Sequence, residues 1–398
     1  MAARVAARPY DVLSSDEARV EAEGNPYSFL HVGKPEIDLP PAVDLYDNRV
    51  YQKARENLDR FIRDGILKQD PVPSLYLYAQ TLDGHAQYGL VGCVSVAEYL
   101  NDTIKKHEHT RKDKEVDRTK HVSVTNAHSG PIFLTYRADE ELDSITGEIR
   151  ANRPDMDFLA SDLIRHQLWV ISDPGLIQRI TEAFKEIPNL YVADGHHRSA
   201  AAARVGKELA AANPHHTGDE EYNFFLAVLF PHNQLRIMDY NRMVRDLGGM
   251  TIEQLLSKVS TEFTVEYAEE SVKPGQKGEF GVYVKEEWYR LRAKPSLLAI
   301  RDPVERLDVS ILQNHLLGPI LGVDDPRTNK RIDFVGGIRG LEELQRRVDS
   351  GEMAVAFSLY PTSIDELLAI ADAGRVMPPK STWFEPKLRD GVVVHMVT

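Results

Sequence analysis

Apolar and polar positions alternate along the chain in short segments, some with the spacing of strands and others with that of helices. Apolar runs at 74–80 and 87–97 flank the dipeptide Asp83-Gly84, which is typical of hairpin turns, so the runs are predicted to pair as antiparallel strands. Residues 45–67 have helical spacing. Further strands are predicted at 131–136, 166–171, 189–193, 223–230, 234–238, 264–267, 279–285, 287–292, 332–335 and 353–359, and further helices at 174–185, 198–213, 251–260, 308–317, 341–348 and 364–373. This mixture predicts an α+β (mixed α/β) fold.

Chain length sets the expected organisation. With 398 residues, two or three domains of ordinary size are expected, each large enough to bury a core without a disulfide or a structural metal. We predict three consecutive parts: an N-terminal α/β region over 1–130, a core over 131–248, which the histidine-rich motif described below marks as phosphate-binding, and a C-terminal α/β region over 249–398.

Charge is distributed unevenly along the chain. There are 48 Lys and Arg against 61 Asp and Glu, a formal charge of -13, which disfavours extended nucleic-acid binding but allows a small anion in a local basic pocket. Residues 101–121 differ, because they contain almost no apolar side chains and many lysines and arginines. We interpret them as a basic loop that orders over bound phosphates and excludes water. The alternative interpretation is a solvated charged loop.

The expected compartment follows from cysteine and apolar content. The single cysteine, Cys93, cannot form an intramolecular disulfide, and its apolar strand places it in the predicted core. No apolar run approaches the roughly 20 residues that span a bilayer, and no secretory signal is visible. The expectation is a soluble cytoplasmic protein with no membrane partner.

The clearest chemical motif is the segment Tyr191-Val-Ala-Asp-Gly-His-His-Arg, which follows a short predicted strand. A glycine turn from a strand into a helix brings free backbone N–H groups and the positive end of the helix dipole to one point, which favours phosphate. Arg198 can bind phosphate bidentately, and His196 and His197 can donate hydrogen bonds to it. Asp194 can hold a histidine tautomer, a metal ion or a substrate hydroxyl. The alternative is an ordinary helix cap at Asp194 with solvated histidines.

A second group of polar residues combines Lys105-Lys-His-Glu-His-Thr, Asp117-Arg118 and Asn126-Ala-His-Ser-Gly-Pro. Glu108 lies among cations that can position it as a general base for a hydroxyl nucleophile, and the cations can neutralise a phosphoryl group. The His-Glu-His order lacks the spacing of a zincin metal site. A solvated charged loop explains this group equally well.

A third segment, near the end of the chain, places Lys380, Ser381 and Thr382 after a rigid Pro-Pro step. It lacks the glycine spacing of a Walker loop. The interpretations are a binding segment for phosphate or substrate, or a proline-rich terminal strap.

Seven motifs in order carry a family resemblance: Arg8-Pro-Tyr-Asp-Val, Asn25-Pro-Tyr, His107-Glu-His-Thr with Asp117-Arg118, Ser129-Gly-Pro-Ile-Phe, Ala193-Asp-Gly-His-His-Arg, Leu307-Asp-Val, and Met377-Pro-Pro-Lys-Ser-Thr-Trp-Phe. On these motifs the chain resembles the family catalogued as domain of unknown function 1015, over nearly its whole length. The histidine-rich segment is also similar to the phosphate-binding helix start of ParB/sulfiredoxin-like proteins, including SerK-type free L-serine kinases.

The resemblance implies a ParB/sulfiredoxin-like core and a kinase that transfers a phosphoryl group from ATP or ADP, with Mg²⁺, to free L-serine. The implied site comprises catalytic Glu108, His107 and Asp194, phosphate-binding Gly195, His196, His197, Arg198, Lys105 and Arg118, substrate-binding Lys380, Ser381, Thr382 and Asn126, and Asp194 as the metal ligand. The implied partners are the nucleotide and a small hydroxy amino acid, with no nucleic acid and no membrane; a homodimer is left open.

Two other functions remain open from the sequence. One is a ParB-like protein in which nucleotide binding drives a conformational switch without any small-molecule kinase activity. The other is a metal-dependent hydrolase that uses the histidine-rich groups, including His215 and His216, although these lack the spacing of metal ligands.

Overall fold

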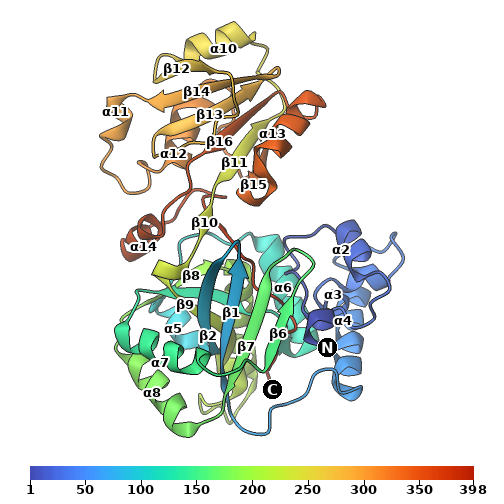
Figure 1. Cartoon of the computed structure of the whole chain (residues 1–398). Helices are drawn as coiled ribbons and strands as arrows, with labels where there is room; N and C mark the ends of the chain where they lie inside the picture. The colour runs from blue at the N-terminus through green and yellow to red at the C-terminus, as the bar shows by residue number, and fades with distance from the viewer. The chain divides into compact units, whose positions relative to one another are not determined.

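The computed structural model describes all 398 residues, which divide into two compact units. The first unit consists of residues 1–106, 110–235 and 386–398, and the second of residues 107–109 and 236–385. This division differs from the three consecutive parts expected from the sequence, because strands on both sides of residue 130 belong to one sheet. Both units contain helices and sheets, as Figure 1 shows, so the α+β fold class is confirmed.

An eight-stranded sheet forms the centre of the first unit, with the strand order β3-β8-β5-β9-β2-β1-β7-β6 (Figure 1). Its strands are β1 Leu75–Leu82, β2 His85–Ser95, β3 Ile104–Lys105, β5 Ile132–Tyr136, β6 Met156–Leu159, β7 Arg165–Ile171, β8 Leu190–Asp194 and β9 Phe224–Pro231. The predicted hairpin is confirmed, since β1 and β2 pair antiparallel across a turn in which Asp83 and Gly84 both have positive φ. A separate pair joins β4 Ala127–His128 to β18 His395–Met396.

The helices of the first unit bury their apolar faces in two larger cores and one small cluster. They are α1 Ala2–Val5, α2 Ser15–Ala22, α3 Leu30–Gly33, η1 Pro35–Asp38, α4 Asn48–Arg63, α5 Val96–Leu100, α6 Lys112–Thr125, α7 Glu140–Arg150, α8 Pro174–Lys185, α9 His196–Ala212, η2 Glu221–Asn223 and η3 His232–Gln234. One core lies along the sheet and includes Leu77, Leu134 and Phe225. The other packs Phe29 and Phe61 among the N-terminal helices. Apolar burial of this kind is the main driving force for folding.

The predicted basic loop over 101–121 is wrong in its second half, because residues 112–125 form helix α6. This helix packs against α4 and α9, and its buried side chains include Asp117 and His121. Asp117 accepts a hydrogen bond of 2.8 Å from the Tyr51 hydroxyl, and His121 is bonded to the Val32 carbonyl at 2.9 Å. Since the packed face is polar, apolar periodicity did not reveal the helix.

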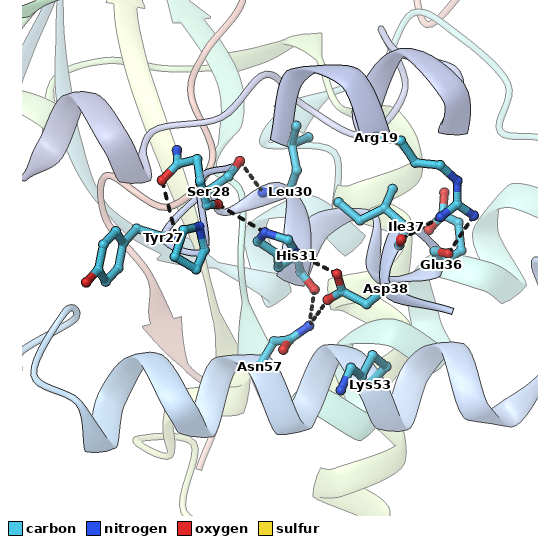
Figure 2. Close-up of polar contacts among 12 residues, drawn as sticks. Arg19, Tyr27, Ser28, Leu30, His31, Glu36, Ile37, Asp38, Lys53 and Asn57 are labelled. Carbon is cyan, nitrogen blue, oxygen red and sulfur yellow. Dashed lines mark hydrogen bonds and ion pairs between the residues drawn. The ribbon is translucent and has the colours of Figure 1, made fainter. Parts of the chain in front are cut away.

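Polar contacts fix the N-terminal helices to one another (Figure 2). Asp38 accepts hydrogen bonds of 2.8 Å from the His31 ring and from the Asn57 amide, and the same amide donates to the His31 carbonyl at 2.7 Å. Burial alone would raise the pKa of Asp38, but the hydrogen bonds from His31 and Asn57 hold it below its ordinary value. Asn57 on α4 thereby holds the α3 and η1 segment in place.

The second unit is built on a six-stranded antiparallel sheet with the strand order β12-β14-β13-β16-β11-β15. Its strands are β11 Tyr240–Val244, β12 Phe263–Ala268, β13 Glu279–Val284, β14 Glu287–Ala293, β15 Ile332–Gly336 and β16 Val355–Leu359, with β10 Ile237–Met238 and β17 Trp383–Phe384 as a separate pair. Its helices are α10 Ile252–Val259, α11 Pro295–Leu298, α12 Asp308–Leu312, η4 Gln313–Leu317, η5 Gly337–Arg339, α13 Gly340–Asp349 and α14 Ile364–Asp372. The long strand predicted at 234–238 is reduced to the two residues of β10.

Two features bear on the predicted surroundings of the protein. Cys93 does lie on a strand, β2, but its side chain is exposed, so its predicted place in the core is wrong. None of the helices combines the length and the apolar character that crossing a membrane requires.

Candidate functional site

The predicted strand, glycine turn and helix are confirmed at the histidine-rich motif. Strand β8 ends at Asp194, Gly195 follows with φ +94°, and the 17-residue helix α9 begins at His196. A Cβ atom added to Gly195 would lie 3.2 Å from Nε of Arg198, in a backbone conformation that side chains disfavour. Glycine therefore lets the turn close tightly against Arg198 at the N-terminus of α9, where backbone N–H groups favour an anion.

Arg198 is held in one position with part of its donor capacity unused. Its Nη1 donates to the Pro131 carbonyl at 2.7 Å and lies 3.8 Å from Oδ1 of Asp390. Its Nε is buried and has no hydrogen-bond partner in the protein. A guanidinium fixed at one end, with a buried donor at the other, is arranged to bind an oxygen of a ligand.

A cavity of about 30 Å³ lies beside this guanidinium. Its lining includes Arg118 from α6, Arg198 from α9, His128 from β4, and Asp390 and Tyr10 from the two ends of the chain. A single buried water needs only ~10–15 Å³, so the cavity has room for a small polar group but not for a whole nucleotide. Two of the predicted phosphate-binding residues, Arg118 and Arg198, thus meet at one place although they lie 80 positions apart.

Arg118 is positioned by its neighbours on both sides. It forms an ion pair of 2.8 Å with Asp117, and its guanidinium lies 4.0 Å from the centre of the Tyr10 ring. Burial raises the pKa of the Tyr10 phenol, which is therefore neutral and can donate a hydrogen bond. The cavity wall accordingly carries two fixed cations.

Asp390 is the acidic residue of the cavity, and no motif in the sequence pointed to it. It is buried, and its Oδ1 has no hydrogen-bond partner. Burial raises its pKa to about 7, with Asp11 acting in the same direction, although Arg198 and Arg118 oppose the rise. Near neutral pH this carboxyl group exists in both protonation states, so it can donate or accept a hydrogen bond.

The raised pKa of Asp390 predicts a specific pH dependence of stability. Between the ordinary pKa of 3.8 and about 7, the folded protein keeps a proton that the unfolded chain releases, so the contribution of Asp390 to stability falls as pH rises and levels off above that range. The D390N variant has no carboxyl group to titrate at this position. As pH rises through this range, the free energy of unfolding of D390N should therefore increase relative to that of the original protein. Urea unfolding of both proteins at several pH values measures the difference; parallel pH profiles would contradict the assignment.

Asp194, the predicted metal ligand, is already paired. Its Oδ2 forms an ion pair of 2.9 Å with Lys387, and its Oδ1 accepts from the Gly195 N–H at 2.9 Å. Burial would raise the pKa of Asp194, but Lys387 and Arg198 outweigh burial and hold it well below its usual range. Mg²⁺ prefers carboxylates and phosphate oxygens at short distance, and one carboxylate bound to an ammonium group does not fit it. The role of Asp194 as a metal ligand stays a prediction, and it would require Lys387 to release the carboxylate.

The two histidines of the motif differ in their surroundings. His196 is buried, and burial lowers its pKa to about 4, so its ring is neutral at physiological pH. The Nε2 of His197 accepts a hydrogen bond of 3.0 Å from the Arg111 N–H, which ties the start of α9 to the residue before α6. The positive charge of the motif therefore comes from Arg198.

The other predicted site residues lie at several places. Glu108 and His107 belong to the second unit, as does the segment 380–382, in which the Ser381 hydroxyl donates to the Pro378 carbonyl at 2.6 Å. Lys105 lies on β3 of the first unit. Asn126 ends α6 with φ 58°, and its amide donates to the Thr398 hydroxyl at 2.6 Å. Their catalytic and binding roles stay predictions, and Asn126 has a visible structural role in holding the last residues of the chain.

Comparison with family models finds one family, described as protein of unknown function (DUF1015), whose model matches residues 1–310. No protein of curated function matches the sequence.

Solved structures with a related arrangement are distant from this chain. A conserved hypothetical protein from Pyrococcus furiosus is 15% identical with a TM-score of 0.37, covering 75% of this chain and 93% of the other. A free serine kinase in complex with AMP is 12% identical with a TM-score of 0.39, covering 77% and 92%. SbnI with a C-terminal truncation from Staphylococcus aureus is 13% identical with a TM-score of 0.40, covering 75% and 85%. Likenesses this remote do not transfer a function.

Proposed function

The chain belongs to the DUF1015 family, which is described as a family of proteins of unknown function, and for this member we propose a nucleotide-dependent phosphotransferase activity. The proposed reaction moves a phosphoryl group from ATP or ADP to the hydroxyl of a small amino acid, free L-serine, and gives O-phosphoserine. The bond between the phosphoryl group and its leaving oxygen breaks, a bond to the serine oxygen forms, and a base takes the hydroxyl proton.

The observation that carries this proposal is the meeting of Arg118 and Arg198 at one cavity, beside the glycine turn that begins α9. Phosphoryl transfer depends mainly on positioning and on neutralising charge, with little covalent chemistry for the protein to perform. Two fixed guanidiniums, a buried donor at Nε of Arg198 and the N-terminus of a long helix are the groups that bind an oxyanion.

The proposal retains Glu108 as the base predicted from the sequence. A carboxylate that accepts the proton of the serine hydroxyl speeds the reaction by typically ~10²–10⁴-fold. The E108A variant is therefore expected to lose serine-dependent nucleotide turnover while it still binds nucleotide; unchanged turnover would show that another group takes the proton.

The experiment that tests the function is a panel of hydroxy compounds incubated with ATP or ADP, with and without Mg²⁺, and analysed for phosphorylated product by mass spectrometry. Product with L-serine and not with L-threonine or glycerol supports the proposal in full. Product with a different hydroxyl compound keeps the phosphotransferase and corrects the substrate. Absence of product with every compound refutes the kinase and favours a nucleotide-dependent switch.

A further inference from the structure

Three side chains in contact with one another, Glu221, His395 and His128, connect the protein surface to the cavity. Strands β4 and β18 place His128 opposite His395, and their rings stack with centres 5.3 Å apart. The Nδ1 atoms of the two rings lie 3.1 Å apart, at hydrogen-bond distance. The Nε2 of His395 lies 2.7 Å from a carboxylate oxygen of Glu221, which is largely exposed.

The carboxylate at the outer end determines which nitrogens carry protons. A carboxylate only accepts, so Nε2 of His395 carries a hydrogen and donates it to Glu221. In the neutral ring, Nδ1 of His395 is then an acceptor, and the Nδ1 of His128 must donate to it. The remaining nitrogen of a neutral His128, Nε2, therefore has a free lone pair.

This lone pair has no partner within the protein. His128 is 7% exposed, its Nε2 is buried without a hydrogen bond, and the residue lines the cavity that Arg198 and Asp390 also line. Burial lowers the pKa of His128 to about 3, with His395 acting in the same direction, so the ring stays neutral at physiological pH. Buried acceptors are normally satisfied, and a ligand donor is the partner this geometry provides for.

We infer that Nε2 of His128 accepts a hydrogen bond from an N–H or O–H group of the ligand, and that Glu221 and His395 hold it in the accepting tautomer. The cavity then binds the donor end of a small molecule next to the anion held by Arg198. An α-amino acid has this chemistry, since its ammonium group and, in serine, its hydroxyl group are donors. The inference rests on the proposed function and deepens it: this cavity receives the donor group of the acceptor amino acid, and His128 is a substrate-positioning residue.

Two substitutions at position 128 separate ligand binding from structural support. The amide of asparagine can occupy the position of Nδ1, so H128N keeps a donor for His395 and lacks an acceptor in the cavity. The longer glutamine side chain can place its oxygen near the position of Nε2, so H128Q keeps the acceptor and loses the bond to His395. If His128 had only a structural role, H128N would preserve that role better than H128Q, because asparagine keeps the hydrogen bond to His395.

Isothermal titration of L-serine and of L-alanine, each with and without ADP, measures the outcome. H128N should weaken binding of L-serine by about tenfold or more, as expected for a hydrogen bond to a charged or hydroxyl donor, whereas H128Q should stay within about threefold of the original protein. Loss of the effect with L-alanine assigns the bonded group as the hydroxyl, and an equal effect assigns it as the ammonium. ADP affinity should be unchanged in both variants.

Three results would overturn the inference: unchanged L-serine binding in H128N, a larger loss in H128Q than in H128N, or no binding of L-serine to the original protein. Failure of the proposed function is read separately, from the absence of phosphorylated product. Nitrogen NMR of the unsubstituted protein provides a check that needs no variant. It should show a nonprotonated Nε2 on His128 whose resonance moves when L-serine is added; a protonated Nε2 would contradict the tautomer assignment.

Discussion

Replacing Arg198 with lysine is expected to lower serine-dependent nucleotide turnover by about 100-fold, the size of effect that follows the loss of one fixed donor to a developing anion. The guanidinium donates to the Pro131 carbonyl with one nitrogen, and its buried Nε has no partner in the protein. A lysine ammonium is a single point charge, so it cannot occupy both positions at once. Steady-state kinetics of R198K, with product measured directly, tests this expectation.

The matched control for this substitution is Arg204, on the same helix. Arg204 is half-exposed and pairs with Glu208 one turn further along, so R204K should leave turnover within a factor of two or so, as is usual for surface ion pairs. Because Arg198 is also a structural donor, thermal unfolding and ADP binding of R198K must be measured together. A variant that unfolds normally and turns over like the original protein would remove Arg198 from the site.

Alanine at Gly130 is expected to close the cavity and to lower the free energy of unfolding by about 1–3 kcal/mol, the range for overpacked sites. A Cβ atom at this position would lie 2.1 Å from Oδ1 of Asp390 and 2.7 Å from its Cγ, far inside contact distance. Asp390 cannot easily retreat, since its backbone is bonded in both directions to Ala7, at 2.9 and 3.1 Å. Denaturant unfolding of G130A measures the loss.

Two further variants show whether the contact with Asp390 is the cause. In the double variant G130A/D390A the atoms that collide are gone, so most of the lost stability should return, and the two effects should be strongly non-additive. G147A places the same methyl group in helix α7, where nothing lies within 4 Å, and should be neutral or stabilising by up to about 1 kcal/mol. Equal losses in G130A and the double variant would locate the strain elsewhere.

Local patterns predicted much of the secondary structure. The helix over 174–185 was predicted to the residue, because a proline at its first turn and an amphipathic repeat are both local signals. The strand, glycine turn and helix around Gly195 were predicted for the same reason. Helix α6 was missed, since its buried face carries Asp117 and His121 in place of apolar residues.

Site residues were predicted where they stand in a sequence motif. They were missed where only the tertiary fold brings them together. Arg198 stood out beside a glycine turn, and Arg118 in a basic stretch, and the structure brings both to one cavity. Asp390 stood in no motif, whereas Tyr10 stood in the motif Arg8-Pro-Tyr-Asp-Val, from which no role in the site was predicted for it. His128 stood inside a quoted motif, yet its partner His395 lies 267 positions away in the sequence. The series of contacts from Glu221 to the cavity therefore could not be predicted from the sequence.

By itself the sequence determined the family, the mixed α+β composition and the glycine turn between the strand and the helix at 194–198, because these depend on residues close together in the chain. Only the tertiary structure decided which distant side chains share the cavity, that Asp194 is neutralised by Lys387, and that one nitrogen of His128 has no partner in the protein. Pairing and burial depend on contacts between segments far apart in sequence, and these contacts also set the local dielectric environment that shifts each pKa.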